Sequence, residues 1–526
     1  MSTLQMLQAP HDAHSTDEHA VIKKVLRRLI PFLILCFLVN YIDRTNISIA
    51  QHSMENTLLG SDGKSIFVQG VFDFGLSIFF IPYCLLELPS ILIQERVGNR
   101  RWIARIMISW GIVSTCFIFT QGPVSFYILR MLLGICEAGF FPGIILYLSF
   151  WVPKQYRARA SAYFFLSTAF AQIIGNVLGG YILYFTGKYG LPGHPWQWLF
   201  VLEGIPSIIT GIVVLFYLTE KPSDAHWLTP QERTRLSDIM AREKRQILER
   251  HSDSSGKPQL ASHAGDHSAT AFKHALTSPA TWLLSLIYIA MNLGYTPVQF
   301  YTPKTLKNVL HNSGVIILQE DVTKAAAATA TAVDHAASVA LPVVTPDHLV
   351  NLYLGLLSAI PFGAAALAML IIARHSDRRR NRLPHIMICS GLMSAGLILA
   401  ALATQFGTGG AATVVTIAGF SVAAIGWFGA FATFWSLPAQ LMTGTAIAAA
   451  LAIINSLGNL MGNFVAPNIR KYLGDQGSLY FAAAGAAFGI VATLMLKYFD
   501  RHSTDAPPSP HPETTTSPLA RTTSQT

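Results

Sequence analysis

Long apolar stretches separated by short polar segments run through the chain from residue 25 to residue 498. A helix needs about 20 mostly apolar residues to cross a lipid bilayer. The pattern therefore predicts an all-α integral membrane protein with twelve membrane-spanning helices. We place these spans at residues 25–47, 67–93, 102–121, 125–151, 158–186, 197–218, 280–302, 349–373, 384–405, 412–436, 441–470 and 478–498.

Two longer polar segments interrupt the pattern and suggest a domain organisation. The central one separates six spans from six, and its residues 232–250 predict a charged helix followed by a Ser/His/Gly-rich flexible linker at 251–268. The other contains an Ala-rich stretch at 325–340, which we interpret as a low-complexity insertion. The expected parts are an N-terminal segment 1–24, a six-helix bundle 25–219, a central loop 220–278, a second bundle 279–500 with the insertion 304–347, and a disordered tail 501–526.

Composition agrees with a membrane protein and excludes several other classes. Charged residues make up 12% of the chain and hydrophobic residues 52%, whereas about 25% of a typical soluble domain is charged. This argues against a soluble enzyme, a nucleic-acid-binding domain and a mostly disordered chain. The five cysteines lie in apolar segments without C-x-x-C spacing, so we expect no disulfide framework and no metal site.

The basic residues predict the orientation of the chain in the membrane. They form clusters within residues 23–28, 96–105, 154–159 and 374–382, while the alternate loops are poor in Lys and Arg. Because positively charged loops stay on the cytoplasmic side, both termini are expected to be cytoplasmic. The first apolar run has no small-residue cleavage site, so we interpret it as a span and not as a signal peptide.

The two halves of the chain show a weak internal repeat. Glu95 is followed by arginines after the second span, and Asp377 is followed by arginines after the eighth span, the second of the other half. Two six-helix halves with a binding site between them at the middle of the membrane form one of the known transporter architectures.

Several motifs resemble those of a known family. Residues 95–101 resemble the cytoplasmic signature of the major facilitator superfamily, although Glu95 stands where that signature has Asp. More specific strings are similar to its anion:cation symporter branch; they lie at residues 41–47, 87–90, 100–105, 129–143, 196–206 and 454–460. Two departures from the branch are Pro82 and Met461, which stand where it usually has Gly.

The resemblance covers roughly residues 20–500 and implies both a fold and a function. It implies the major facilitator fold, with twelve transmembrane helices in two pseudo-symmetric six-helix bundles. It also implies a monomer in the bacterial inner membrane that imports a small organic anion together with protons, with the proton gradient as energy source and no cofactor. Sugar acids, dicarboxylates and aromatic acids all fit the branch, and the sequence does not choose among them.

A few charged residues lie inside the apolar spans, where a charge costs several kcal/mol unless it faces a cavity or a partner. They are Asp43, Arg44, Asp73, Glu87, Arg130, Glu137 and Glu203. Arg130 and Glu137 are seven residues apart and therefore share one helix face. This favours a polar central cavity, and a structural ion pair between helices is the alternative.

These residues suggest a transport chemistry. Arg44 or Arg130 supplies a permanent charge and a planar group suited to a carboxylate. In the resemblance, Asp43 and Glu137 match the proton-coupling carboxylates, and a buried carboxyl can take up a proton near neutral pH. Arg44 is the expected partner that controls their protonation.

Three polar residues are further candidates for substrate binding. Tyr41 can donate its hydroxyl to a substrate carboxylate or can pack at the interface. Asn455 and Gln172 either bind substrate or form hydrogen bonds between helices.

Other charges are interpreted as structural or gating groups. We expect ion pairs at the cytoplasmic helix ends to hold the outward-open state and to break during transport; the candidates are Glu95, Arg96, Arg100, Asp377 and Arg378. Glu203 and Glu87 are assigned to gating or packing. Asp73 is expected near the outer end of its span, within reach of water.

Alternative functions make different demands on the sequence. An exchanger or exporter of related carboxylates needs the same residues, so it remains an alternative function. A membrane sensor with a transporter fold needs a sizeable output domain, for which the central loop and tail are small. A membrane-embedded enzyme needs a nucleophile, a metal cluster or a carboxylate pair at an interface, and an ATP-driven pump needs a Gly-x-x-x-x-Gly-Lys-Ser/Thr motif. The sequence shows no such catalytic groups and no such motif, so we expect neither an enzyme nor an ATP-driven pump. The low content of charged residues argues against a nucleic-acid partner.

Overall fold

The computed structural model describes residues 9–249, 275–317, 344–379, 381–407, 409–438 and 446–504. Within these ranges it leaves out the side chains of residues 9–17, 69, 154–155, 157–166, 244, 246–249, 377, 446–448 and 500–504. The predicted linker at 251–268, the Ala-rich stretch at 325–340 and the tail from residue 505 lie outside the described residues.

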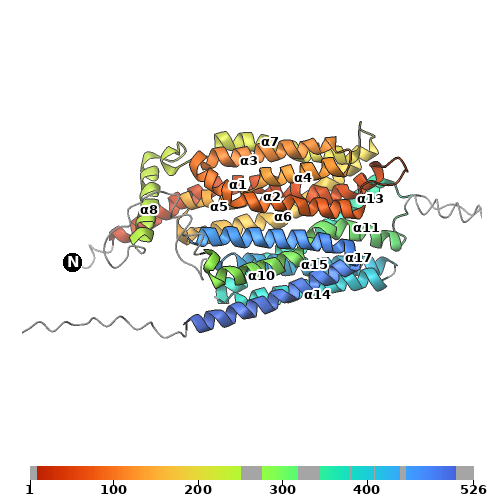
Figure 1. Cartoon of the computed structure of the whole chain (residues 1–526). Coiled ribbons are helices and arrows are strands. Elements are labelled where there is room, and N and C mark those ends of the chain that lie inside the picture. Colours follow the sequence, from red (N-terminus) through yellow and green to blue (C-terminus); the bar gives the residue numbers. More distant parts are fainter. Residues whose placement is uncertain are drawn as a thin grey trace, which may run out of the picture.

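The N-terminal half is a bundle of long helices that forms the upper layer in Figure 1. Its elements are α1 (Ala9–Thr57), α2 (Gln69–Val97), α3 (Asn99–Thr115), the 3-10 turn η1 (Cys116–Phe119), α4 (Pro123–Glu137), α5 (Phe140–Trp151), α6 (Lys154–Lys188) and α7 (Pro195–Tyr217). The fourth predicted span is divided into α4 and α5 because the chain leaves the helical conformation at Ala138 and Gly139, whose φ is +87°. Glycine adopts such a positive φ without a steric penalty.

The C-terminal half forms the lower layer of Figure 1. Its elements are α10 (Pro279–Thr296), the π-helical turn η3 (Pro297–Tyr301), α11 (Thr302–Asn312), α13 (Asp347–Arg379), α14 (Leu383–Phe406), α15 (Gly409–Phe434) and α17 (Ala446–Thr504). The seventh span was predicted to end at residue 302, and this boundary is wrong because η3 and α11 continue the helix to Asn312.

The spans themselves agree with the prediction. Eleven helical stretches in the described part of the chain are long and apolar enough to cross a membrane. The last of them, α17, has a non-helical Gly474 (φ +71°) in its interior and contains the two final predicted spans, the first of which is described from residue 446. The predicted all-α fold with twelve spans is therefore confirmed.

The central segment packs against one end of the N-terminal half, which we call the α8 end. Here α8 (Pro230–Glu249) confirms the predicted charged helix. The Arg28 guanidinium lies 4.7 Å from the ring centroid of Tyr217 and 5.0 Å from that of Trp227. The Lys24 ammonium of α1 donates a hydrogen bond of 2.7 Å to Glu232 of α8. The residues that follow α7 are thus attached to the bundle through both charge and aromatic contacts.

The two halves meet along two pairs of helices, α2 with α17 and α6 with α13. Gly180 and Gly355 allow the second pair to approach closely, since a Cβ atom on Gly180 would lie 2.8 Å from the Cα of Gly355. Small residues at such crossings are typical of helix packing in membranes.

At the opposite end, which we call the α11 end, polar side chains connect the halves. Lys304 of α11 contacts Glu55 of α1 at 2.9 Å, and Asn56 of α1 donates a hydrogen bond of 3.2 Å to Asp347 of α13. The α11 end is therefore closed by contacts between the halves.

Candidate substrate cavity

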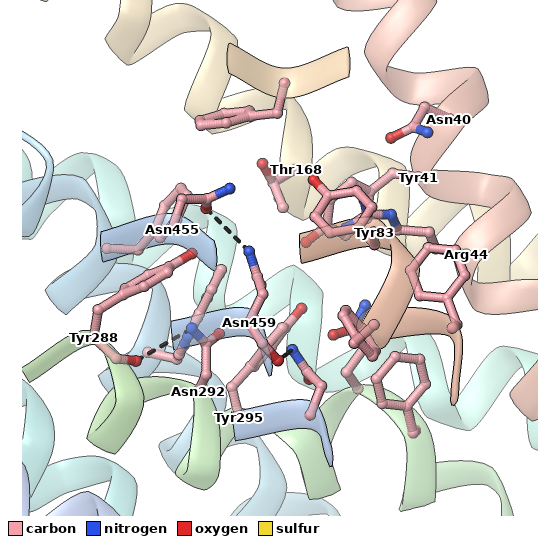
Figure 2. A pocket seen from close by; sticks show the side chains of 18 of the residues that line it. Asn40, Tyr41, Arg44, Tyr83, Thr168, Tyr288, Asn292, Tyr295, Asn455 and Asn459 are labelled. Atoms are coloured by element: carbon pink, nitrogen blue, oxygen red, sulfur yellow. Dashed lines mark hydrogen bonds between the residues drawn. The ribbon is translucent and has the colours of Figure 1, made fainter. Parts of the chain in front are cut away.

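A cavity lies between the two halves, and both halves supply its wall (Figure 2). It encloses about 830 Å³, including space open to solvent. The N-terminal half contributes Phe37, Asn40, Tyr41, Arg44, Phe79, Phe80, Tyr83, Arg130, Leu133, Phe141 and Thr168. The C-terminal half contributes Tyr288, Asn292, Tyr295, Gln299, Phe300, Trp427, Phe431, Asn455, Asn459 and Asn463.

Two arginines line the N-terminal wall. Arg44 forms an ion pair with Glu137 and lies 5.1 Å from the ring centroid of Tyr83. Arg130 donates a hydrogen bond of 2.8 Å from Nε to the carbonyl oxygen of Gly75, and its guanidinium lies 4.8 Å from the Phe79 ring. Because Arg130 is buried and fixed by these contacts, its charge has a defined position in the wall.

The two predicted proton-coupling carboxylates lie behind this wall and are not among its lining residues. Glu137 is the last residue of α4 and accepts hydrogen bonds from Arg44 and from the side chain of Asn40 at 2.8 Å. Asp43 accepts hydrogen bonds from Ser114 of α3 and from Asn46 at 2.9 Å. Adjacent helix positions differ by about 100°, so Arg44 contacts the cavity while Asp43 contacts the neighbouring helix.

The C-terminal wall carries a row of neutral amides. Asn455, Asn459 and Asn463 follow one another at intervals of four residues on α17, so they share a helix face. Asn459 donates a hydrogen bond of 3.0 Å to Oδ1 of Asn455, shown as a dashed line in Figure 2. The sequence analysis identified Asn455 alone, although the spacing of four also identifies Asn459 and Asn463.

The two other predicted substrate-binding residues have different positions. Tyr41 lines the cavity. Gln172 does not line it but donates a hydrogen bond of 2.8 Å to the hydroxyl of Tyr295, whose ring stacks on Trp427 with centroids 3.9 Å apart. Gln172 of α6 therefore supports a cavity residue of the other half.

Two buried carboxylates, Glu87 and Asp73, connect α2 with α17. Glu87 accepts hydrogen bonds from Asn455 and Ser456. Asp73 was expected within reach of water, but it is 2% exposed and lies 3.4 Å from Arg470. Arg470, which the sequence analysis did not single out, is also 2% exposed. Arg470 stands at the end of a predicted span and next to Lys471, a sequence position that suggests an exposed side chain.

The predicted gating residues lie mainly at the α8 end. Glu95, Arg96 and Arg378 are exposed, and their side chains form no hydrogen bond or ion pair with another residue of the described ranges. The backbone N–H of Arg100 donates a hydrogen bond of 3.0 Å to the carboxylate of Glu220. The side chain of Asp377 lies outside the described residues.

Glu203, also assigned to gating, is buried elsewhere. It is 3% exposed on α7 and interacts electrostatically with Asp43. In the part of the chain that the structure describes, no group of three or more His, Cys, Asp or Glu side chains has the arrangement of a metal site.

A helical membrane protein whose two halves enclose a central polar cavity has the architecture of a secondary transporter. Residues 33–467 match the Major Facilitator Superfamily, and the chain belongs to this family. The predicted superfamily is thus confirmed. The chain is a multi-pass membrane transporter and not an enzyme, and transport in this superfamily needs no cofactor.

Several known proteins are similar over nearly the whole chain. A protein of Agrobacterium vitis named "Putative tartrate transporter" is 35% identical over 488 residues, which are 92% of this chain and 96% of that protein. The "Quinolone resistance transporter" of Acinetobacter baumannii is 29% identical over 485 residues, 91% of this chain and 95% of that protein. The partially occluded, inward-open structure of the Escherichia coli xylose transporter XylE has the same fold, with a TM-score of 0.60, 16% identity, and coverage of 90% of this chain and 98% of XylE.

Proposed function

We propose that this transporter imports a small organic anion, such as a sugar acid, a dicarboxylate or a related carboxylate, together with protons by alternating access. The observation that carries the proposal is the charge of the cavity wall, whose described lining includes two arginines and no acidic side chain. Arg44 and Arg130 bind the substrate carboxylate. The asparagine row and Tyr41 bind its remaining oxygen atoms, and the relative named for tartrate supports this substrate class.

Competition for Arg44 couples the substrate to protons. Glu137 and a substrate carboxylate both need the Arg44 guanidinium, which now binds Glu137. When the substrate takes over this partner, Glu137 is left buried without its cation and takes up a proton, because an isolated buried charge is costly. Asp43 accepts hydrogen bonds from an amide and a hydroxyl and from no cation of the described residues. It takes up the second proton because a buried carboxyl is less costly when neutral. Neutralising both groups lowers the cost of the occluded state.

We infer the orientation of the transporter in the membrane from its basic clusters. The α8 end lies in the cytoplasm of a bacterial cell, with both termini there, because the basic clusters belong to that end. The closed α11 end then faces outward. The exposed Glu95, Arg96 and Arg378 form ion pairs only when the α8 end closes, together with Arg100 and Asp377. Glu203 acts on Asp43 during that change. We expect the protein to act as a monomer made of the bundles 25–219 and 279–500.

An exchanger or exporter of related anions is the second candidate. The similarity to a protein named for quinolone resistance favours it, as does the aromatic lining of the cavity. The two candidates differ in whether a pH gradient drives net accumulation.

The test is uptake of radiolabelled tartrate into proteoliposomes with an imposed pH gradient. The wild type should accumulate tartrate when the medium on the α11 side is acidic. Asp43→Asn should abolish this accumulation and leave counterflow against internal tartrate. The matched control is Asp224→Asn, the same chemical change at an exposed position, which should behave as the wild type.

Each result has a distinct meaning. Unchanged accumulation by Asp43→Asn would refute the role of Asp43 in coupling. Counterflow without accumulation in the wild type would favour the exchanger. Failure of tartrate, aldonates and aromatic acids alike to enter would refute the substrate class.

A further inference from the structure

The buried carboxylate Glu87 connects the cavity wall of one half to a helix of the other. It lies on α2 with an exposed fraction of 0%. Its two carboxylate oxygens accept hydrogen bonds from consecutive residues of α17, one from the side-chain amide of Asn455 and one, of 2.5 Å, from the hydroxyl of Ser456. Asn455 lines the cavity, whereas Ser456 does not.

These contacts determine how the Asn455 amide is oriented. An asparagine side chain has one acceptor oxygen and one NH₂ group, and either end can face a given neighbour. Both carboxylate oxygens of Glu87 act as acceptors, so the NH₂ group of Asn455 faces Glu87. The oxygen of Asn455 then accepts the hydrogen bond of 3.0 Å from Asn459. Glu87 thereby orients two successive amides of the cavity wall.

We propose that Glu87 is a positioning residue for substrate selectivity, acting through Asn455 and Asn459. Each of these amides uses one N–H in the chain of hydrogen bonds that begins at Glu87, and each retains a second N–H that donates to no other described residue. Both remaining donors suit an acceptor oxygen, such as a hydroxyl on the carbon skeleton of the anion. The cavity should therefore prefer hydroxylated dicarboxylates over plain ones. This inference rests on the proposed function, because it takes Asn455 as a substrate-binding residue.

A purely structural role for Glu87 predicts different behaviour. If Glu87 only joins α2 to α17, its bond with Ser456 should matter as much as its bond with Asn455. Loss of either bond would then lower stability and transport rate without changing which anion is preferred. Selectivity between two anions of similar size separates the two explanations.

The experiment measures counterflow of labelled tartrate, with succinate as the unhydroxylated competitor, in proteoliposomes. Glu87→Met keeps the length of the side chain but removes both acceptors. It should raise the KM for tartrate about ten-fold, the effect of roughly one hydrogen bond, with little change in the maximal rate and in inhibition by succinate. Glu87→Gln retains an acceptor for Asn455 and should restore most of the affinity for tartrate. Ser456→Ala is the matched control and should leave the preference for tartrate unchanged.

A double-variant comparison tests whether Glu87 acts through Asn455. Asn455→Ala should raise the KM for tartrate about as much as Glu87→Met, and the combined variant should be no worse than either, because residues that act as one unit are not additive. Multiplied effects in the combined variant would overturn the proposal. So would a Glu87→Gln variant as impaired as Glu87→Met, or a changed preference in Ser456→Ala.

A swapped pair keeps the proposal testable if Glu87→Met does not fold. Asn455→Asp places two carboxyls together and should lower the melting temperature in detergent, and adding Glu87→Gln should restore it because the hydrogen bond re-forms with donor and acceptor exchanged. The swapped pair should still have a raised KM for tartrate, since position 455 then has no N–H to offer. Full recovery of both stability and affinity would overturn the positioning role. Absence of saturable counterflow of tartrate, succinate, aldonates and aromatic acids alike in the wild type would instead refute the proposed function. Transport of another carboxylate without tartrate would overturn the preference for hydroxylated dicarboxylates.

Discussion

The two walls of the cavity differ in chemistry. The N-terminal wall has fixed positive charges, Arg44 and Arg130, with carboxyls behind them. The C-terminal wall has neutral amides and aromatic rings, such as Asn459 and the stacked Tyr295. We therefore propose that one half attracts the anion and that the other recognises its shape and hydroxyl groups. A substrate that contacts both walls stabilises the arrangement in which the halves are close.

One of the buried ion pairs lies within the N-terminal half, and another joins the two halves. Arg44 and Glu137 belong to the same half, so movement of the halves does not by itself separate them. The pair of Asp73 and Arg470 crosses from α2 to α17 at the α11 end. Arg470 also contacts Asp475 at 2.7 Å and lies 4.1 Å from the Tyr301 ring. A pair that crosses between the halves is expected to break whenever that end opens.

The largest effect should follow loss of charge from the N-terminal wall. Arg44→Gln leaves Glu137 buried without its cation, and breaking a buried pair in this way costs roughly 3–5 kcal/mol. Tartrate counterflow should fall more than about 100-fold. Arg44→Lys, which retains the charge, should keep a measurable part of the activity. Similar counterflow in Arg44→Gln and wild type would show that the charged wall does not bind the anion.

The next effect concerns the pair that crosses the halves. Asp73→Asn removes one partner of Arg470 but leaves Asp475, so we expect a cost of about 1–3 kcal/mol. The α11 end should open more often. In a variant without the native cysteines, a cysteine introduced by His52→Cys, at a position that is 5% exposed, should react several-fold faster with a polar thiol reagent when Asp73→Asn is added. An unchanged rate would mean that this pair does not control closure.

A smaller effect is expected from the neutral wall. Asn459→Ala removes one amide of the row and should raise the KM for tartrate about ten-fold without lowering the maximal rate. Asn468→Ala is the matched control, because Asn468 lies on the same helix but bonds to Ser77 outside the cavity. Equal effects of the two variants would indicate a general disturbance of α17 and would contradict the division of roles between the walls.

The smallest effect is expected away from both walls, at the α8 end. The hydrogen bond from Lys24 holds the pKa of Glu232 below its ordinary value. A lowered pKa means that the pair stabilises the folded protein above the ordinary pKa of a glutamate and loses this contribution as the pH falls through the folded pKa.

Glu232→Gln should therefore lower stability at pH 7 by at most about 1 kcal/mol, since the pair is partly exposed. The difference from wild type should vanish in acid. Melting followed by tryptophan fluorescence at several pH values measures this, because Trp227 belongs to the central segment and packs against Arg28 of α1. A difference that persists in acid would contradict the assignment.

The sequence predicts some features of the cavity residues and not others. The adjacency of Asp43 and Arg44 showed that their side chains diverge, but not that Arg44 faces the cavity and Asp43 faces Ser114. Helical periodicity gives relative directions around one helix, whereas the absolute direction depends on which helices pack around it. The motif near Glu87 was recognised, yet its contacts lie 368 and 369 residues away in the chain, in α17.

The sequence by itself determined the spans, since the length of an apolar run is a local property set by the thickness of the bilayer. It also determined which few charges had to find partners inside the membrane. Only the tertiary structure decided those partners, as in the pair of Asp73 with Arg470. It also decided that the seventh span continues into α11, where Lys304 contacts Glu55. The physical reason is that the cost of a buried charge is offset by groups brought near it in space, and these come from helices far apart in the chain.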